Sequence, residues 1–341
     1  MSDVAPAASM IVDAHAHVIV PEITRDAAPA EDWRPHVYRE DGRQVVEMDG
    51  RAIRSAIGEF VDVDAILAAQ ATAGIDHVLL SPLVTLLFGD AEPEQALARC
   101  RIQNDALAGI VRAHPERVSA LGAVPLQDPP LAARELEALM AGGALAGVEV
   151  AASVGGLALG DDRFEPFWDA AERTGALVFI HPTTRGFPVA ALQDLYLWNL
   201  VGNPMETTVT AAHMVLGGVL ERHPRLRVLL AHAGGAVLAL RGRLRHGHAA
   251  VAAAGARLGE PPEDSLRRLH YDTITHDPAL LRAVVEFAGA ERVLMGSDQP
   301  FDMADPDPAE TVRAAGLAPE AQAAVLGANA ARLLGLEVAA G

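Results

Sequence analysis

The chain has 341 residues, half of them hydrophobic, which is enough for a large buried core in one big domain or two ordinary ones. Its 45 acidic and 27 basic residues give a formal net charge of −18, which argues against a surface that binds nucleic acid or an anionic membrane. The single cysteine, Cys100, excludes an internal disulfide framework and suits a reducing cytosol, so we expect a cytoplasmic protein.

Two segments bear on membrane association. The N-terminal stretch MSDVAPAAS has no basic region and does not resemble a signal peptide. The apolar stretch 139–160 is long enough to cross a bilayer, but it contains several glycines and has Glu149 in its middle. We interpret it as a helix end, a turn, a buried strand and a loop, and we expect no membrane span.

Short apolar runs alternate along the chain with longer Ala-, Leu-, Glu- and Arg-rich segments that have helical spacing. Most of the runs are continuous, which is typical of strands buried on both faces of a parallel sheet. We predict eight strands, at 10–15, 77–81, 118–124, 147–150, 176–181, 226–232, 269–273 and 292–297. We predict helices at 62–73, 93–113, 129–141, 163–174, 205–222, 235–250, 278–289, 306–316 and 318–334.

Eight strands that are each followed by a helix predict an α/β protein with a (β/α)8 fold, a TIM barrel, over the single domain 1–341 with a C-terminal helix. An open doubly wound sheet is the alternative. Such a sheet normally has a glycine-rich turn after its first strand, whereas this first strand ends in histidines.

Residues 18–61 interrupt the alternation directly after the first strand. The segment is mostly polar, and an alternating stretch with EDGR at its centre predicts a small hairpin over 37–48. A loop or hairpin inserted after strand 1 falls on the face of a barrel where active sites lie. A second excursion, 182–204, follows the fifth strand.

The chain has two H-x-H pairs, which are weak evidence by count alone among thirteen histidines. His15 and His17 lie at the end of the first strand, where residues i and i+2 face the same way and can reach one ion. Asp13 is expected to share that face one layer deeper and to support the site without binding the ion. His246 and His248 lie in a predicted helix, where residues two apart diverge, so we interpret them as solvated side chains.

Other ligand-type residues end other strands. His181 ends the fifth strand, His232 ends the sixth, and Asp298 follows the eighth. Because the C-terminal ends of barrel strands meet at one rim, we expect these residues to face one pocket. Imidazole and carboxylate groups there suit one divalent metal ion, with Zn²⁺ the first choice and Mn²⁺ also possible. The predicted ligands are His15, His17, His181 and Asp298, with His232 as a fifth ligand or as the acid/base group.

Together these motifs resemble the amidohydrolase superfamily. The details are similar to one branch, the amidohydrolase-2 group, which includes aminocarboxymuconate-semialdehyde decarboxylase and γ-resorcylate decarboxylase. The resemblance extends from residue 12 to the final helix, and the stretches that carry it are VDAHAHV, ALGAVPLQDP, VFIHP, NPMETT, GGVLERHPRLRVLLAHAGG, RVLMGSDQPF and GANAARLLGL.

The resemblance implies a role for each of these polar residues. His15, His17, His181 and Asp298 would hold the metal, and His232 would be the catalytic acid/base beside the metal-bound water, with Asp298 counted among the catalytic residues. Other branches carry a lysine at the end of the fourth strand that bridges two metals. Here that strand reads GVEVAAS without a lysine, which favours one metal ion.

The resemblance also implies two arginines that bind substrate carboxylates. One follows the first strand in the decarboxylase, and Arg51 and Arg54 compete for that role here, with Arg54 at the matching offset. The second comes from a neighbouring subunit and matches Arg243, which implies a homodimer or higher homo-oligomer. A guanidinium suits either place because its fork matches a planar carboxylate.

Three residues depart from the pattern of the decarboxylases. Gln299 stands where a tyrosine follows the strand-8 aspartate, Arg185 is added in the loop after the fifth strand, and His276 lies near the rim. These changes leave the substrate open but do not affect the metal centre.

We therefore predict a metal-dependent carboxy-lyase that removes CO2, without oxidation, from a small unsaturated or aromatic carboxylic acid. No organic cofactor is expected, since the chain has neither a G-x-G-x-x-G motif nor a P-loop. The alternative is a metal-dependent hydrolase of a lactone or amide, or a hydratase, of the same superfamily. A metal-binding scaffold without activity is a third interpretation, and the presence of all five polar groups argues against it.

Overall fold

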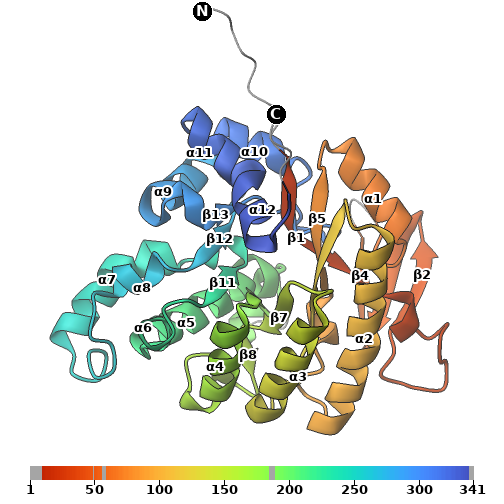
Figure 1. Cartoon of the computed structure of the whole chain (residues 1–341), viewed down its shortest axis with the longest axis horizontal. Coiled ribbons are helices and arrows are strands. Elements are labelled where there is room, and N and C mark those ends of the chain that lie inside the picture. Colours follow the sequence, from red (N-terminus) through yellow and green to blue (C-terminus); the bar gives the residue numbers. More distant parts are fainter. Residues whose placement is uncertain (1–9, 49, 56–58, 184–188, 338–341) are drawn as a thin grey trace, which may run out of the picture.

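A sheet of eight parallel strands forms the centre of the computed structural model, which describes residues 10–48, 50–55, 59–183 and 189–337 (Figure 1). The strands follow the order β1-β5-β6-β7-β10-β11-β12-β13. Their bounds are Val12–Val18, His77–Pro82, Val118–Gly122, Gly147–Ala151, Leu177–His181, Arg227–Leu230, His270–Asp272 and Val293–Leu294. All eight predicted strands are present, and their bounds differ from the predicted ones by a few residues.

The sheet closes on itself between β1 and the segment after β13. The backbone amide of Ala14 donates to the carbonyl of Met295 at 2.8 Å, and the amide of His17 donates to the carbonyl of Gln299 at 2.8 Å. A bridge between Ala16 and Gln299 continues this pairing. Because both edge strands are paired, the (β/α)8 barrel is confirmed, and the open doubly wound sheet is wrong.

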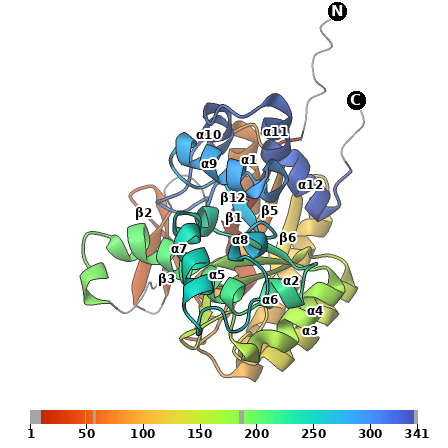
Figure 2. The same cartoon turned by 90° about the vertical axis from the view of Figure 1, so that its left-hand side faces the viewer.

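Helices cover the outside of the barrel (Figures 1 and 2). The predicted helix 205–222 is two helices, separated at Gly218, whose φ is +73°. Across the described ranges no helix combines the length and the apolar character needed to cross a bilayer. The bounds are α1 Val63–Thr72, α2 Pro93–Ala113, α3 Pro129–Gly142, α4 Glu165–Thr174, α5 Asn203–Leu216, α6 Val219–Arg222, α7 Val237–Ala250, α8 Pro262–Leu266, α9 Pro278–Ala288, α10 Pro308–Ala314, α11 Pro319–Ala323 and α12 Asn329–Leu334.

The apolar stretch 139–160 has the predicted composition. It contains the end of α3, the buried strand β7, and the two short strands β8 Ser153–Val154 and β9 Leu157–Ala158. Glu149 lies in β7 and is 1% exposed, so its carboxyl faces the barrel interior rather than solvent. The stretch is therefore part of the barrel.

A bulge in β1 decides which side chains of this strand face the metal ligands. The register against β5 shifts between Asp13 and Ala16. Val12 and Ala14 pack inside the barrel, whereas Ala16 packs between the sheet and the helices that cover it. The bulge therefore reverses the alternation of side chains along the strand. The side chains of Ala14 and His15 therefore both point into the barrel, although neighbouring residues of a regular strand face opposite sides.

Asp13 does not share the face of His15, contrary to the prediction. Its carboxylate accepts a hydrogen bond from Gln70 of α1 at 2.9 Å and another from the hydroxyl of Ser297 at 2.5 Å. It also accepts from the backbone amide of His15 at 3.0 Å. The residue therefore joins β1 to α1 and to the end of the eighth strand, and the bulge, which a period of two cannot anticipate, is the reason.

Both excursions from the alternation lie at the C-terminal end of the barrel. The first contains the predicted hairpin, β2 His36–Glu40 and β3 Arg43–Met48, and a third antiparallel strand that was not predicted, β4 Arg51–Arg54. The second contains a π-helical turn, Trp198–Gly202, that leads into α5. Figure 2 shows both projecting from the same side of the barrel.

Candidate metal centre and active site

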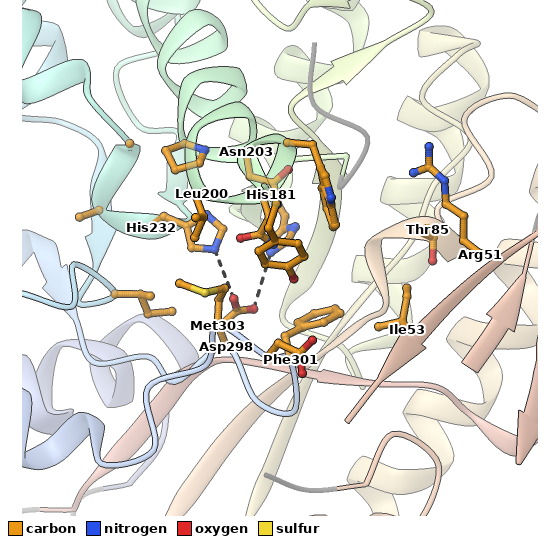
Figure 3. Close-up of a pocket in the computed structure, with 18 of the residues that line it drawn as sticks. Arg51, Ile53, Thr85, His181, Leu200, Asn203, His232, Asp298, Phe301 and Met303 are labelled. Carbon is orange, nitrogen blue, oxygen red and sulfur yellow. Dashed lines mark hydrogen bonds and ion pairs between the residues drawn. The ribbon is translucent and has the colours of Figure 1, made fainter. Parts of the chain in front are cut away.

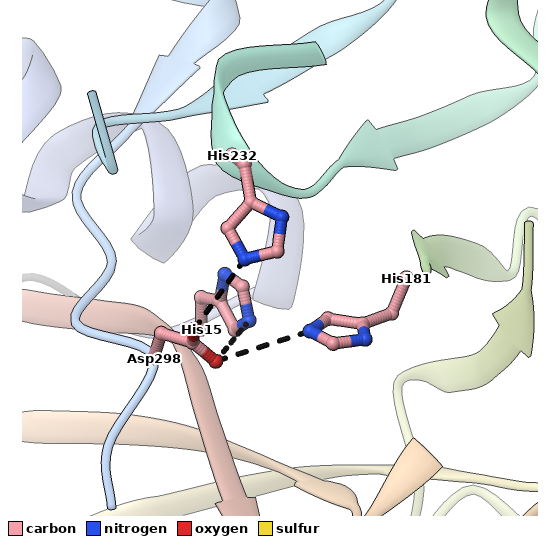
Figure 4. Close-up of side chains that lie close together, drawn as sticks. All are labelled: His15, His181, His232 and Asp298. Atoms are coloured by element: carbon pink, nitrogen blue, oxygen red, sulfur yellow. Dashed lines mark hydrogen bonds and ion pairs between the residues drawn. The ribbon is translucent and has the colours of Figure 1, made fainter. Parts of the chain in front are cut away.

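Polar side chains from four parts of the barrel converge at its C-terminal end (Figure 4). His15 comes from β1, His181 from β10, His232 from the turn after β11 and Asp298 from the segment after β13, and one ligand atom of each lies within 4.8 Å of the others. His17 joins them: its Nε2 lies 3.1 Å from Nε2 of His15 and 3.2 Å from Oδ1 of Asp298. The structure thus brings together all five residues that the strand ends indicated.

Hydrogen bonds on the outer side of the rings aim the histidines at Asp298. Nδ1 of His15 donates to Oδ2 of Asp272 at 2.7 Å. Nδ1 of His181 donates to the backbone carbonyl of the next residue at 2.9 Å, and Nδ1 of His17 donates to a backbone carbonyl of β5 at 3.1 Å. Because carboxylate and carbonyl oxygens only accept, each Nδ1 carries a hydrogen, and each Nε2 faces the cluster.

The donor atoms of the cluster fit a divalent metal ion. Among the described residues, Nε2 of His181 and Oδ1 of Asp298 are buried without a hydrogen-bond partner, 3.8 Å apart. Lone pairs of imidazole nitrogens and of a carboxylate that face one another at such distances repel unless a cation lies between them. Three imidazoles and one carboxylate form a donor set that Zn²⁺ and other first-row divalent metals accept.

The electrostatics of the cluster agree with this assignment. Burial lowers the pKa of His181 to about 3, so its ring is neutral, as a ligand must be. Burial would lower the pKa of His15 as well, but the carboxylates of Asp298 and Asp272 outweigh it and raise that pKa to about 10, so this ring is protonated unless a cation balances the two carboxylates. Burial would raise the pKa of Asp298, but the surrounding histidines hold it well below its usual range. The cluster is therefore built around an ionised carboxylate and favours positive charge.

Glu149 is a second carboxyl group close to the cluster. It lies on β7, and one of its oxygens is 3.9 Å from Nδ1 of His17. Burial raises its pKa well above the usual range. The carboxyl lies against the ring nitrogen of His17 that points away from the cluster, so it is not a member of the ligand set.

A strained turn carries His232. The φ angles of His232 and Ala233 are +55° and +52°, and that of Asp298 is +62°. Such left-handed backbone costs a residue other than glycine about 1–2 kcal/mol, and strain of this kind concentrates at functional sites. The amides of His232 and Ala233 donate to Asp272 at 2.8 and 2.7 Å and hold the turn. Nε2 of His232 thereby lies 3.3 Å from Oδ2 of Asp298.

Gly235 ends this turn where only a glycine fits. Its φ is +63°, and a Cβ at this position would lie 2.0 Å from the carbonyl oxygen of Pro204. The missing side chain lets the turn pack directly against the first residues of α5. A glycine at position 235 is therefore required by both the backbone conformation and the space.

A cavity of about 1290 Å³ opens over the cluster (Figure 3). His181, His232 and Asp298 line it, and the side chain of His232 is 15% exposed. The two excursions supply much of its walls, which include Val46, Met48 and Ile53 from the first and Tyr196, Trp198 and Leu200 from the second. A wall that combines apolar and aromatic side chains with polar groups is typical of a site for a small organic molecule.

The predicted substrate arginines lie in different places. Arg51 lines the cavity, on the same side as Thr85 (Figure 3). Arg54 is not among the lining residues, since its guanidinium pairs with Glu40 at 2.6 Å and its side chain is 47% exposed. Arg243 lies on α7, exposed and away from the cavity of its own chain. The structure thus brings Arg51, but neither of the other two, to the site.

The other polar residues singled out in the sequence differ in whether they line the cavity. His276 lines the cavity with a φ of +53°, whereas Arg185 lies outside the described residues. His246 is exposed on α7, and Nε2 of His248 contacts the carbonyl of Leu258 at 2.8 Å, so this pair is far from forming an ion site. Gln299 closes the barrel through its backbone rather than lining the cavity.

Sequence reasoning missed Asp272, which touches both His15 and the turn of His232. The signal was present, because the stretch YDT ends the seventh strand as histidines end the fifth and sixth. Asp272 reaches the cluster only through His15 and the turn of His232, so its residue type and position alone do not mark it as part of the site.

A family model described as amidohydrolase matches residues 12–336 of the chain. The chain belongs to the amidohydrolase family. The predicted family is therefore confirmed. The five polar residues predicted from the strand ends are the ones that converge at the barrel rim.

Decarboxylases are prominent among the similar members of this family. A 2-amino-3-carboxymuconate-6-semialdehyde decarboxylase of Dictyostelium discoideum is 30% identical over 293 residues, 85% of this chain and 81% of the relative. The crystal structure of 5-carboxyvanillate decarboxylase from Sphingomonas paucimobilis has a TM-score of 0.79 and 27% identity, and covers 96% of this chain and 99% of its own. These relatives favour the predicted carboxy-lyase over the hydrolase alternative.

A second solved structure shares the fold at lower identity. The dihydroxybenzoic acid decarboxylase from Polaromonas sp. JS666, solved with bound manganese and the inhibitor 2-nitroresorcinol, has a TM-score of 0.76 and 21% identity, with 97% of this chain and 98% of its own covered. At this identity the likeness supports the barrel architecture.

Proposed function

We propose that this chain is a metal-dependent decarboxylase that removes CO2, without oxidation, from a small aromatic or unsaturated carboxylic acid. The observation that carries the proposal is the position of His232. Its Nε2 reaches the metal-ligand cluster, and its ring is open to a cavity with aromatic walls. The decarboxylases similar to this chain support the same reaction.

The reaction requires a proton donor and a substrate that is held in one orientation. His15, His17, His181 and Asp298 would hold a divalent cation, which would supply positive charge for the substrate carboxylate and for the charge that develops on the substrate. His232 gives a proton to the carbon that bears the carboxylate, which forms a C–H bond and interrupts the conjugation. The C–C bond then breaks, its electron pair restores the conjugated system, and CO2 leaves. The net change replaces a carboxylate by a hydrogen.

Arg51 is the residue that we assign to a second anionic or polar group of the substrate. It lines the cavity away from His232, on the side of Thr85, and no ion pair to it occurs within the described part of the chain (Figure 3). Arg54, which matches the family offset, instead holds Glu40. The conformation of β4 therefore favours Arg51 for the role that either could have from sequence.

A second copy of the chain would complete the assembly. The excursion after β10 exposes a group of apolar side chains, Leu195 at 80%, Leu200 at 47%, Val201 at 42% and Tyr196 at 39%. Two of these, Tyr196 and Leu200, also line the cavity. A homodimer over this face would cover apolar surface next to the site and could bring Arg243 of one copy to the cavity of the other. Light scattering of the purified chain tests this proposal, which predicts twice the mass of one chain.

The metal is proposed to be Zn²⁺, with Mn²⁺ as the second choice, because imidazole and carboxylate ligands serve both. Elemental analysis of protein purified without added metal distinguishes them. Location in the cytoplasm is likewise a proposal, based on the single cysteine, and fractionation of the source cells tests it.

Offering a panel of acids tests the proposed reaction. Aromatic acids with ring hydroxyl groups and muconic-type acids are incubated with the metal-loaded enzyme, and CO2 release is followed beside hydrolysis of a matched panel of lactones. We expect CO2 from at least one acid and no lactone opening. Lactone opening without CO2 release from any acid would contradict the decarboxylase proposal and support the hydrolase alternative.

A further inference from the structure

We propose that Asp272 is a positioning residue that sets both halves of the site, the metal ligand His15 and the proton-transfer residue His232. The proposal rests on the proposed function only for the role of His232. Asp272 ends β12 and is 0% exposed, so its carboxylate lies inside the barrel with no access to solvent. It lines neither the cavity nor the ligand cluster, so it can act only through the residues that it touches.

One oxygen of Asp272 joins the two halves directly. Oδ2 accepts from Nδ1 of His15 at 2.7 Å and from the backbone amide of His232 at 2.8 Å. The first bond keeps the hydrogen of the His15 ring on Nδ1, so that the lone pair of Nε2 faces Asp298. A ring without this partner could carry its hydrogen on Nε2 or rotate, and in either case it would stop being a ligand.

The other oxygen holds the backbone around it. Oδ1 accepts from the amide of Ala233 at 2.7 Å and from the amide of Ile274 at 3.0 Å. The amides of His232 and Ala233, in successive left-handed residues, both point at this carboxylate, an arrangement that binds anions elsewhere in proteins. The negative charge of Asp272 thus stabilises a turn that its own sequence would not favour.

Asp272 therefore couples the geometry of the metal ligand to the geometry of the proton-transfer group. The two residues that it joins are 217 positions apart in the chain, His15 on β1 and His232 after β11, and Asp272 lies on the strand between β11 and β13 in the sheet order. A shift of either histidine would therefore displace the other, because one buried carboxylate oxygen holds both.

The test measures Zn²⁺ affinity, by competition with a chromogenic chelator, in the full chain. Asp272→Ala should weaken Zn²⁺ binding tenfold to a hundredfold, the loss that follows removal of partners behind metal ligands. Asp305→Ala is the matched control, because Asp305 is also a buried aspartate, 6% exposed, that holds the amide of Asp307 and the hydroxyl of Thr311. The control should bind Zn²⁺ like the wild type.

A second background separates positioning from general loss of structure. In a His15→Ala chain the ring through which Asp272 acts is gone, so adding Asp272→Ala should change Zn²⁺ affinity by less than about threefold. A residue with a merely structural role would lower the affinity equally in both backgrounds. If Asp272→Ala does not fold, Asp272→Asn, which keeps the shape but has one acceptor oxygen for four donors, takes its place.

Zn²⁺ affinity of a folded Asp272 variant within about twofold of the wild type would overturn the proposal, and so would equal losses in the two backgrounds. The outcome is independent of the reaction. If the wild type binds Zn²⁺, the Asp272 variant binds it weakly, and no acid releases CO2, then the decarboxylase fails while the positioning role is supported.

Discussion

The guanidinium of Arg54 lies 2.6 Å from the carboxylate of Glu40, so the ion pair holds this arginine on the three-stranded sheet and outside the cavity. Arg51, on the same short strand, lines the cavity instead. The two arginines thus lie in different places although they are three residues apart. We therefore propose that Arg51, and not the paired Arg54, binds the substrate.

Substituting the two arginines one at a time checks this separation. Arg51→Ala should raise KM about tenfold to a hundredfold, because it removes a charge-assisted hydrogen bond of about 1.5–3 kcal/mol. Arg54→Ala removes an exposed ion pair and should change KM by less than about twofold. Steady-state kinetics with the acid found in the panel provide the measurement. A large rise in KM for Arg54→Ala alone would mean that Arg54, which has the offset of the family's arginine, is the residue that binds the substrate.

The two H-x-H pairs should differ completely in metal binding. His17→Ala removes a predicted ligand and should weaken Zn²⁺ binding more than a hundredfold, since even partners behind ligands contribute about tenfold to a hundredfold. His246→Ala alters an exposed residue of α7 and is the matched control. Metal content after passage over a chelating column distinguishes them. Equal metal content in both variants would remove His17 from the ligand set.

Acid should destabilise the fold through His270. Burial, together with the positive charge of Arg292, lowers the pKa of His270 to about 4 from an ordinary value of 6.5. Between these two pH values the unfolded chain binds a proton that the folded chain does not, so stability falls as the pH drops below 6.5. At pH 5 the loss from this group should approach about 2 kcal/mol.

Urea unfolding of the wild type and of His270→Gln, at pH 7.5 and at pH 5, isolates this effect. The variant cannot take up the proton, so its stability should depend less on pH than that of the wild type. His246→Gln, at an exposed histidine, should follow the wild type. The same pH dependence in His270→Gln as in the wild type would show that His270 is not the group responsible.

Adding a methyl group at Gly235 should damage both the fold and the site. A Cβ there meets the carbonyl of Pro204 at 2.0 Å and also imposes strain at a φ of +63°. Gly143, at the end of α3, has a similar φ of +68° but nothing within 4 Å of its Cβ position. Gly143→Ala should therefore cost about 1–2 kcal/mol, and Gly235→Ala more than about 3 kcal/mol.

The comparison of these two glycine variants also reports on His232. If the turn shifts away from α5, the turnover number of Gly235→Ala should fall, whereas that of Gly143→Ala should not change. Urea unfolding and turnover are measured on the same samples. Equal losses of stability in the two variants would mean that the close approach to Pro204 has no energetic consequence.

Much of the site followed from where apolar runs end. His181 and His232 end predicted strands and Asp298 directly follows one. A parallel barrel places all such strand ends at one rim, so their convergence needed no knowledge of contacts. The hairpin after strand 1 was equally local, because its turn residues and its alternation are adjacent in sequence.

What the sequence could not provide depends on contacts between distant segments. The bulge that turns Asp13 toward α1 is one inserted residue in an otherwise regular strand, and nothing in VDAHAHV marks it. The strand Arg51–Arg54 forms only because β3 offers it an edge. Asp272 becomes important through bonds to residues far away in the chain, which periodicity cannot detect.

The central claim is tested most directly by CO2 release from the wild type and from His232→Ala, with the metal content of each sample determined in parallel. His232 is assigned to proton transfer, so the variant should retain the metal of the wild type while CO2 release falls by a hundredfold or more, as about 10²–10⁴ is typical for a general acid. Full CO2 release by a metal-loaded His232→Ala variant would show that His232 does not transfer the proton.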